Sequence, residues 1–258
     1  MARATVIGNW KMNLDYVEAI HLVQQLGVLL RANPTTNTDV VVAPPFVDIR
    51  SVTSIVEADR LPIGVGAQHV HFNESGALTG EVSIPMLKRL GVKHVIVGHS
   101  ERRTGFGMTD EIVRATLEAV LTAGMTAVLC CGEDAGTRDA GDAAGFVTAQ
   151  VTSALRGIKS KFAEQVILAY EPIWAIGTGR AADTETVREM LNVVRAAAPK
   201  DFQSGSRVLY GGSVTSANAI EIMVHSDADG FLVGGASLRA DDFVGIIVAV
   251  DGCYRNQG

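Results

Sequence analysis

Three side chains able to do chemistry stand directly after short apolar runs of the sequence. They are the carboxylate of Glu171, the imidazole of His99 and the amine of Lys11, which lies in the segment Asn9-Trp10-Lys11. A carboxylate can act as a general base, an imidazole can polarise a carbonyl group, and a lysine can bind an anion or form a Schiff base. Each residue could instead have a purely structural role: Glu171 as a local cap, His99 as a structural histidine and Lys11 as a solvated lysine. If a helical turn begins after His99, its N-terminal dipole lowers the pKa of the imidazole and favours the neutral form.

Paired glycines suggest what kind of substrate these side chains would meet. Gly211-Gly212-Ser213 and Gly234-Gly235 each follow a further apolar run. Glycine lets backbone N–H groups approach an anion closely, although most isolated Gly-Gly pairs are only tight turns. A base, an imidazole, a cation and a phosphate cradle together favour proton abstraction next to the carbonyl of a phosphorylated small molecule.

The segment after Glu171 is predicted to be a water-excluding lid. Pro172 ends the preceding strand, the following residues are too apolar for a solvated loop, and two glycines allow movement. The predicted lid consists of Pro172, Ile173, Trp174, Ala175, Ile176, Gly177, Thr178 and Gly179. A hydrophobic loop packed on a neighbouring subunit is the structural alternative. The spacing Gly177-x-Gly179-x-x-Ala182 also fits a dinucleotide fingerprint formally, but it lies several residues beyond its strand and lacks the acidic residue about 20 positions on.

The elements that must position these residues alternate regularly along the chain. The predicted strands are Ala4–Gly8, Asp39–Ala43, Pro62–Ala67, His94–Gly98, Thr126–Cys130, Val166–Tyr170, Arg207–Tyr210 and Gly230–Val233. The predicted helices are Leu14–Leu30, Ile49–Ala58, Ile84–Leu90, Asp110–Ala123, Ala143–Leu155, Thr184–Ala197, Ala217–Val224 and Asp241–Val250. This alternation favours an α/β fold, a parallel sheet closed as a single-domain (β/α)8 barrel over residues 1–258, with a doubly wound open sheet as the alternative. In a barrel the residues that follow the strands share one rim.

The bulk composition narrows the class of protein. The 258 residues are 47% hydrophobic, so a large core can form. A net charge of −6 argues against a nucleic-acid partner. Three cysteines, two of them adjacent, make neither a disulfide framework nor a metal cluster. No signal-peptide segment and no apolar run of about 18 residues is found, so we expect a cytoplasmic protein without a membrane partner.

Five motifs at these positions resemble the triosephosphate isomerase family. They are Asn9-Trp10-Lys11-Met12-Asn13, Gly98-His99-Ser100-Glu101-Arg102-Arg103, Tyr170-Glu171-Pro172-Ile173-Trp174-Ala175-Ile176-Gly177-Thr178-Gly179, Tyr210-Gly211-Gly212-Ser213 and Gly230-Phe231-Leu232-Val233-Gly234-Gly235-Ala236-Ser237. The match runs from near residue 5 to near residue 250 in the family's order and spacing. The resemblance implies a TIM barrel that interconverts dihydroxyacetone phosphate and glyceraldehyde 3-phosphate through an enediolate, a reaction of glycolysis and gluconeogenesis, without cofactor or metal.

The resemblance also assigns roles to particular residues. Glu171 would be the base, His99 the neutral electrophile, and Lys11 and Asn9 would assist with charge and positioning. This pairing of carboxylate and imidazole, like the closing lid, is the family's known arrangement. Contacts to the substrate phosphate would come from Gly177, Ser213, Gly234 and Gly235.

A homodimer is a further implication of the resemblance. The segment Gln68–Ser83 is long and turn-rich, and long ordered loops usually serve a function or a partner, although a mobile surface loop is equally compatible with its length. In the family, residues 68–81 would insert into the partner subunit near Lys11, with Thr79 at the loop tip.

Three positions depart from the family's pattern. His69 stands where the family often has Asn, Met108 where it often has Glu, and Arg180 follows the lid where Lys is usual. The first two concern the interface and not the chemistry. We expect burial of the His69 ring to weaken the dimer at acid pH.

Two rival functions differ in class from an isomerase. One is a barrel aldolase that uses Lys11 as a Schiff base, which borohydride would trap. The other is a non-catalytic phosphate-binding relative, in which the base, the imidazole or the lid glycines would be missing. All of these are present in this sequence.

Overall fold

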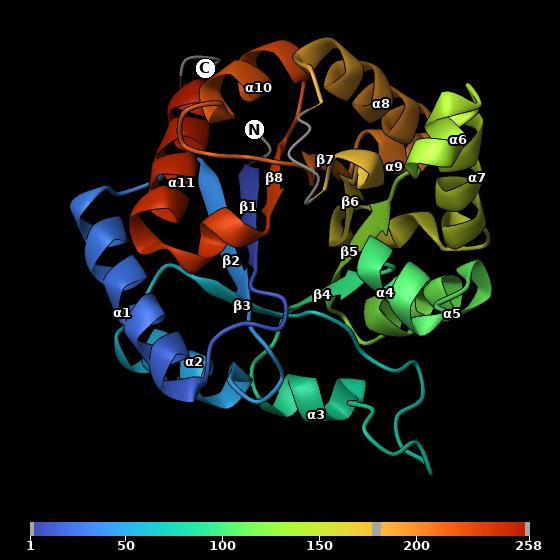
Figure 1. Cartoon of the computed structure of the whole chain (residues 1–258). Helices are drawn as coiled ribbons and strands as arrows, with labels where there is room; N and C mark the ends of the chain where they lie inside the picture. Colours follow the sequence, from blue (N-terminus) through green and yellow to red (C-terminus); the bar gives the residue numbers. More distant parts are fainter. Residues whose placement is uncertain (1–2, 177–181, 256–258) are drawn as a thin grey trace.

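The strands of the computed structural model, which describes residues 3–176 and 182–255, close into a parallel barrel in sequence order (Figure 1). They are β1 (Ala4–Asn9), β2 (Thr38–Ala43), β3 (Gly64–Ala67), β4 (His94–Val97), β5 (Thr126–Cys131), β6 (Val166–Tyr170), β7 (Arg207–Tyr210) and β8 (Gly230–Val233). Closure is made by β8 pairing with β1, from Thr5 opposite Gly230 to Gly8 opposite Val233. The predicted (β/α)8 barrel is therefore confirmed, and the open doubly wound sheet is excluded.

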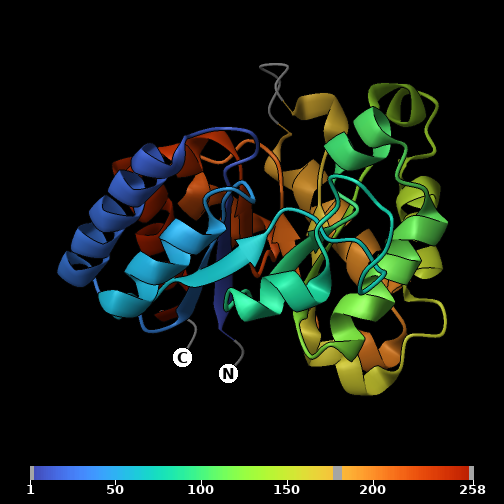
Figure 2. The same ribbon diagram turned by 90° about the horizontal axis from the view of Figure 1, so that it is seen from below.

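Helices surround the strands on the outside, with α1 and α2 on one side and the green helices on the other when the barrel is seen from below (Figure 2). The α-helices are α1 (Tyr16–Ala32), α2 (Ile49–Ala58), α3 (Ile84–Arg89), α4 (Ser100–Phe106), α5 (Asp110–Thr122), α6 (Ala135–Asp139), α7 (Ala143–Leu155), α8 (Thr184–Ala197), α9 (Lys200–Gln203), α10 (Ala219–Ser226) and α11 (Ala240–Arg255). Short 3₁₀ helices are η1 (Ser160–Gln165), η2 (Ile173–Ala175) and η3 (Gly235–Leu238).

Several element boundaries differ from the predicted ones. Strand β3 begins at Gly64 and not at Pro62, which has no N–H to donate to a ladder. Helix α11 continues to Arg255, because Asp251 near its end is buried and accepts the backbone N–H groups of Thr36 and Asn37. Helices α6 and α9 were not predicted, since four or five residues carry too little periodicity to be recognised.

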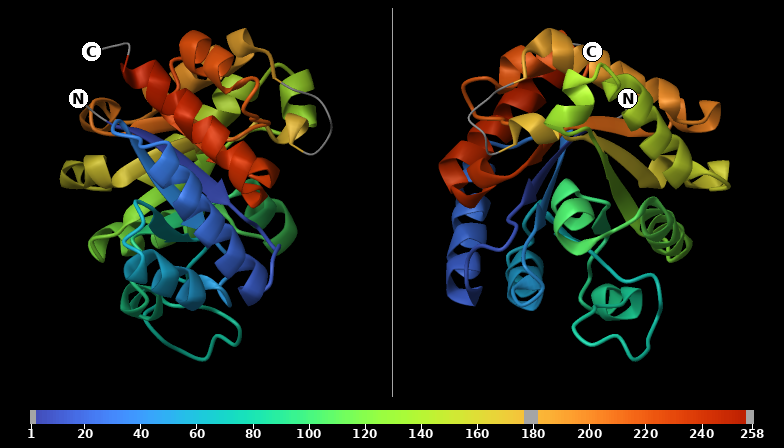
Figure 3. Two further views of the ribbon diagram at one scale, coloured as in Figure 1. Left: turned by 90° about the vertical axis from the view of Figure 1, so that its left-hand side faces the viewer. Right: turned by 45° about the vertical axis from the view of Figure 1, so that its right-hand side comes forward.

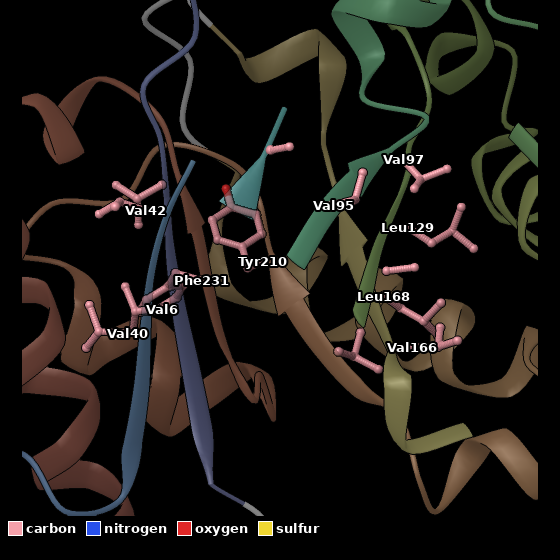
Figure 4. Packing of buried hydrophobic residues seen from close by; sticks show 14 of the residues in the cluster. Val6, Val40, Val42, Val95, Val97, Leu129, Val166, Leu168, Tyr210 and Phe231 are labelled. Atoms are coloured by element: carbon pink, nitrogen blue, oxygen red, sulfur yellow. The ribbon is translucent and has the colours of Figure 1, made fainter. Parts of the chain in front are cut away.

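Alternation along each strand divides the core into two layers. Residues at one set of positions fill the barrel interior, among them Ile7, Val41, Ile96, Ile167 and Leu209. Residues at the other set point outward and pack under the helices, where Figure 4 shows Val6, Val40, Val42, Val95, Val97, Leu129, Val166, Leu168, Tyr210 and Phe231 (Figure 4). Because both faces of each strand are buried, the strands read as continuous apolar runs. This packing holds the strand ends, and hence the loops that follow them, in fixed positions.

The connection between β3 and α3 is the longest excursion from the barrel. In both views of Figure 3 it extends beyond the surrounding helices (Figure 3). Its turns use Gly76 and Gly80 at φ values of 151° and 91°, which side chains rarely adopt. No helix within the described ranges is long and apolar enough to cross a membrane.

Candidate active site

The residues predicted to do chemistry line a single cavity of about 380 Å³ at the carboxyl ends of the strands. Its walls include Asn9, Lys11, His99, Glu171, Ser213, Gly234 and Gly235, together with Gly211, Gly212, Ile176 and Leu232. Parallel strands bring these residues to one rim although they are far apart in the chain. Gly177, Thr178 and Gly179 of the predicted lid, and Arg180, lie outside the described residues.

At the centre of the cavity the carboxylate of Glu171 faces the ring of His99. Oε1 of Glu171 lies 2.9 Å from Nε2 of His99, and Oε2 accepts the backbone N–H of Ser100 at 3.0 Å. Only 1% of Glu171 and 5% of His99 is exposed to solvent. Burial raises the pKa of Glu171, but His99 and the Ser100 N–H outweigh it and hold this pKa below its usual value. The carboxylate is therefore charged and fully paired in this arrangement.

The opposite nitrogen of His99 is held by the start of helix α4. Gly98, at a φ of 72°, turns the chain so that His99 becomes the N-cap of α4, and its Nδ1 accepts the N–H of Glu101 at 3.2 Å. A nitrogen that accepts an N–H carries no proton, so this contact leaves the ring proton on Nε2, facing Glu171.

The helical turn expected after His99 is present as α4, but the expected lowering of the histidine pKa is wrong for this arrangement. Burial does lower the pKa of His99, yet the facing carboxylate of Glu171 outweighs burial and raises it. The helix is too short, and the carboxylate too near, for the helix dipole to decide the direction. Removal of the Glu171 carboxylate from His99 would leave burial and Lys11, which lower the pKa of the ring, and the Glu101 carboxylate 3.7 Å from Nδ1, which raises it.

Lys11 is held in an unusual backbone conformation. Its φ is 54°, a left-handed value that a side-chain-bearing residue rarely adopts. Two contacts fix it, the Lys11 N–H to Oδ1 of Asn9 at 3.1 Å and Nε2 of Gln68 to the Lys11 carbonyl at 2.8 Å. The Nζ atom ion-pairs with Oε1 of Glu101 at 2.6 Å. The cation is thus directed toward the cavity by residues from three separate strand ends.

The glycine-rich wall of the cavity is built for a close approach of backbone. A Cβ on Gly212 would lie 2.1 Å from the Tyr210 hydroxyl, so position 212 has room for glycine alone. Helix η3 begins at Gly235, and the first N–H groups of a helix have no carbonyl partner within it. A Cβ on Gly234 would come within 3.5 Å of Cε of Lys11, so the cation lies beside this wall. An anion placed here would meet backbone N–H groups and a cation together.

The beginning of the predicted lid is attached to the loop after β5. Trp174 donates its indole N–H to Oε1 of Glu133 at 2.8 Å, and the same oxygen accepts from the Tyr170 hydroxyl at 3.0 Å and from Arg138 at 2.9 Å. The Arg138 guanidinium also lies over the Trp174 ring, 4.8 Å from its centroid. Glu133 is fully buried, so its carboxylate ties the start of the predicted lid firmly to the barrel.

Sequence reasoning overlooked several residues that the structure brings to this site. Gln68 follows β3 directly, and Glu133 follows β5 with one residue between. Both would have been found by applying the strand-end rule to every strand, and not only to those followed by conspicuous motifs. The contribution of Ser100 is a backbone N–H, and Gln150 lies inside helix α7, so no sequence signal marks them.

No group of three or more His, Cys, Asp or Glu side chains within residues 3–176 and 182–255 is arranged to hold a metal ion.

Comparison with known proteins agrees across almost the whole chain. The family model described as triosephosphate isomerase matches residues 4–250. Triosephosphate isomerase of Saccharopolyspora erythraea is 48% identical over 248 residues, which is 94% of this chain and 95% of the relative. That of Rhodococcus jostii is 47% identical over 248 residues, with the same coverage. That of Cutibacterium acnes is 45% identical over 254 residues, 96% of this chain and 98% of the relative.

Proposed function

The chain belongs to the triosephosphate isomerase family, an isomerase acting on triose phosphates, and on this premise we propose how the residues of the cavity divide the reaction among them. Glu171 is the base that takes a proton from the carbon next to the substrate carbonyl. His99 donates the Nε2–H to the carbonyl oxygen, which becomes an enediolate oxygen. His99 takes the proton of the substrate hydroxyl in exchange for the one it gives to the former carbonyl oxygen, and the same carboxyl group returns its proton to the neighbouring carbon, so that the carbonyl and the hydroxyl exchange places. This division of roles is the family's known arrangement.

One observation carries the proposal, namely that a buried carboxylate and the Nε2 atom of a histidine face each other at 2.9 Å inside the cavity. A base must lie within hydrogen-bond reach of the proton it abstracts, and an electrophile within reach of the oxygen that gains charge. Both groups reach the same point of the cavity. A substrate that displaces the carboxylate from the ring finds an acceptor for its carbon proton and a donor for its oxygen.

Catalysis in this arrangement requires Glu171 to leave its present partners. Its two oxygens are occupied by His99 and by the Ser100 N–H. A carboxylate so paired is a weak base, and it becomes stronger when these contacts are exchanged for a dry cavity. Once the carboxylate has turned to the substrate carbon, Nε2–H of His99 is free to donate to the carbonyl oxygen. The Glu101 N–H on Nδ1 keeps the ring proton on Nε2, where it faces the substrate.

Lys11, Asn9 and the glycine wall hold the substrate's charged end. Lys11 supplies the cation, and Asn9 fixes the Lys11 backbone through its side chain. Ser213, Gly234 and Gly235 line the wall on which the phosphate rests, as Gly177 does by resemblance. The Nζ atom of Lys11 lies 2.6 Å from Oε1 of Glu101, a contact of the kind that an anion-binding lysine makes.

The test is a coupled assay of glyceraldehyde 3-phosphate conversion that compares the parent with Glu171→Gln. The amide keeps the shape and removes the base, so we expect a loss of about 10²- to 10⁴-fold in kcat. Glu164→Gln, at an exposed position just before β6, is the matched control and should remain fully active. If Glu171→Gln turns over like the parent, another residue is the base. A folded but inactive parent would point to a phosphate-binding relative.

We further propose a homodimer through the loop of residues 68–81, which leaves the barrel at the rim where large apolar side chains are exposed. Met12 is 95% exposed, Val47 80% and Phe106 71%, and these follow β1, β2 and β4 at the same rim. Large apolar side chains so exposed are typical of a surface that a partner covers. We therefore place the partner's 68–81 loop, with Thr79 at its tip, over the region beside Lys11.

Sedimentation of Thr79→Arg tests this assembly. A charged side chain at a buried loop tip costs several kcal/mol, so the variant should sediment as a monomer where the parent is a dimer. Thr152→Arg, at an exposed position of helix α7, should leave the mass unchanged. A dimeric Thr79→Arg protein would place the interface elsewhere.

A further inference from the structure

The carbonyl group of Glu171 lies against Gly132, the residue that follows β5. Gly132 lies so near the Glu171 carbonyl that a Cβ on it would be 1.8 Å from the carbonyl oxygen and 2.7 Å from the carbonyl carbon. Contacts under about 3 Å are not made by real Cβ atoms, so something would have to shift. The atom in the way is backbone and cannot turn aside. The space for Glu171 therefore depends on a hydrogen at position 132.

The peptide of Gly132 is itself fixed from outside the barrel. Its N–H donates to Oε1 of Gln150 at 2.9 Å, and Gln150, on helix α7, is 7% exposed. The carbonyl of the same peptide group, which belongs to Cys131, accepts the N–H of Glu171 at 2.8 Å. The peptide group between Cys131 and Gly132 is thus anchored twice, through its N–H to the helix layer and through its carbonyl to the proposed base. The segment 131–132 joins helix α7 to Glu171.

We infer that Gly132 and Gln150 are positioning residues for the proposed base, Gln150 acting through the Gly132 peptide and Gly132 through the Glu171 backbone. Neither side chain reaches the cavity, and neither touches substrate. The contact fixes where the Cα of Glu171 stands, and therefore which point of the cavity its carboxylate can reach. The inference rests on the role proposed above for Glu171 and adds residues that hold it in place.

Placement of a base has a large effect on rate because the reacting atoms must meet within a narrow range of geometry. A misplacement of about 1 Å can lower turnover by about 10²-fold. A Cβ at position 132 requires a displacement of at least this size, since it must move from 1.8 Å to an ordinary contact distance. Removal of the Gln150 acceptor should lower turnover less. The Gly132 N–H then lacks this acceptor, and the peptide group can rotate, but no atoms are forced apart.

The experiment measures kcat, KM and the pH profile of kcat/KM for Gly132→Ala, Gln150→Met and Gln150→Glu. We expect Gly132→Ala to lose about 10²-fold in kcat with KM little changed. Gln150→Met should lose about tenfold, and Gln150→Glu, which keeps an acceptor oxygen in either protonation state, should recover most of that loss. Gly252→Ala in α11, where a Cβ meets nothing within 4 Å, and Gln203→Met in α9 are the matched controls.

The pH profile separates positioning from a general loss of folded protein. Contacts with His99 and Ser100 hold the pKa of Glu171 low while burial raises it. If the backbone of Glu171 shifts, these contacts lengthen while burial remains, so its pKa rises and the acid limb of kcat/KM moves to higher pH. A smaller folded fraction lowers the whole profile without moving the limb.

Each result decides the inference. A shifted acid limb with reduced kcat in Gly132→Ala and Gln150→Met, and recovery in Gln150→Glu, supports it. The inference is overturned if folded Gln150→Met has the kcat and the acid limb of the parent. It is also overturned if the control Gln203→Met loses as much kcat as Gln150→Met. If Gly132→Ala does not fold, the two Gln150 variants alone decide. Glu171→Gln is assayed in parallel. If Glu171→Gln is inactive while Gln150→Met turns over like the parent, only the positioning role is contradicted. If Glu171→Gln is active, the proposed base itself is contradicted.

Discussion

Nε2 of His99 and Oε1 of Glu171 lie 2.9 Å apart at the ends of β4 and β6, in a cavity where both side chains are almost fully buried. Each is held a second time by backbone, Glu171 by the Ser100 N–H and His99 by the Glu101 N–H. Both of these N–H groups belong to the first turn of α4. One short helix therefore orients the proposed base and the proposed electrophile together, and a change in its start affects both.

His99→Gln tests the electrophile. Glutamine keeps an N–H donor but cannot pass a proton between substrate oxygens as an imidazole does, and its amide is less able to stabilise developing charge. We expect kcat to fall by about 10²-fold or more. His225→Gln, at an exposed position of α10, is the control and should turn over like the parent. An unchanged kcat in His99→Gln would remove the imidazole from the reaction.

Glu133→Leu tests the attachment of the lid. The carboxylate is fully buried and accepts from Arg138, Tyr170 and Trp174, so its removal leaves three donors, one of them charged, without this partner. We expect a loss of about 3 kcal/mol in the free energy of unfolding, measured by urea denaturation. Glu164→Gln gives the baseline for an exposed carboxylate. A loss below about 0.5 kcal/mol, the usual effect at the surface, would mean that the three donors find other partners.

The environment of His94, at the opposite end of the barrel from the cavity, predicts that the free energy of unfolding falls at acid pH. Burial and the nearby Arg207 lower its pKa from 6.5 to about 4, with Asp39 opposing. The folded pKa is below the unfolded one, so the unfolded chain binds the extra proton. Stability is therefore complete above about pH 6.5 and falls by up to about 3 kcal/mol as the pH drops to about 4. Denaturation of His94→Gln should show less of this decline than denaturation of His225→Gln; an equal decline would contradict it.

His69 predicts a similar sensitivity for the assembly. Its ring is buried by its own chain, 3.1 Å from the Glu81 carboxylate, within the loop expected to enter the partner. Burial and Arg102 lower the pKa of His69, and the opposing effect of Glu81 does not outweigh them. The loop in its present conformation therefore favours the neutral ring. Protonation then favours an opened loop, and the dimer dissociation constant should rise between about pH 7 and about pH 5. In His69→Asn this pH dependence should be lost, and a constant that does not change with pH in the parent would contradict the idea.

Much of the architecture could be predicted because barrel strands are buried on both faces. Runs such as Val166–Tyr170 then stand out as apolar stretches bounded by glycine, proline or polar residues, and their number and alternation with helices indicate the barrel. The predicted elements were wrong or missing where the local pattern of apolar residues is weak. Helices α6 and α9 are too short to show a period, and the end of α11 is set by Asp251 capping a distant loop.

The candidate site, too, could be predicted from the sequence only in part. The sequence by itself determined which chemical groups stand at strand ends, including Glu171, His99 and Lys11, because each follows its strand within two residues and parallel strands share one rim. Only the tertiary structure decided that Glu171 faces His99, that this contact and not the helix dipole sets the direction of the histidine pKa, and that Gly132 lies against the Glu171 carbonyl. These are relations across space between segments far apart in the chain. A pattern of residue types records which groups a strand presents, whereas the distance between two groups is set by the packing of all eight strands and their helices.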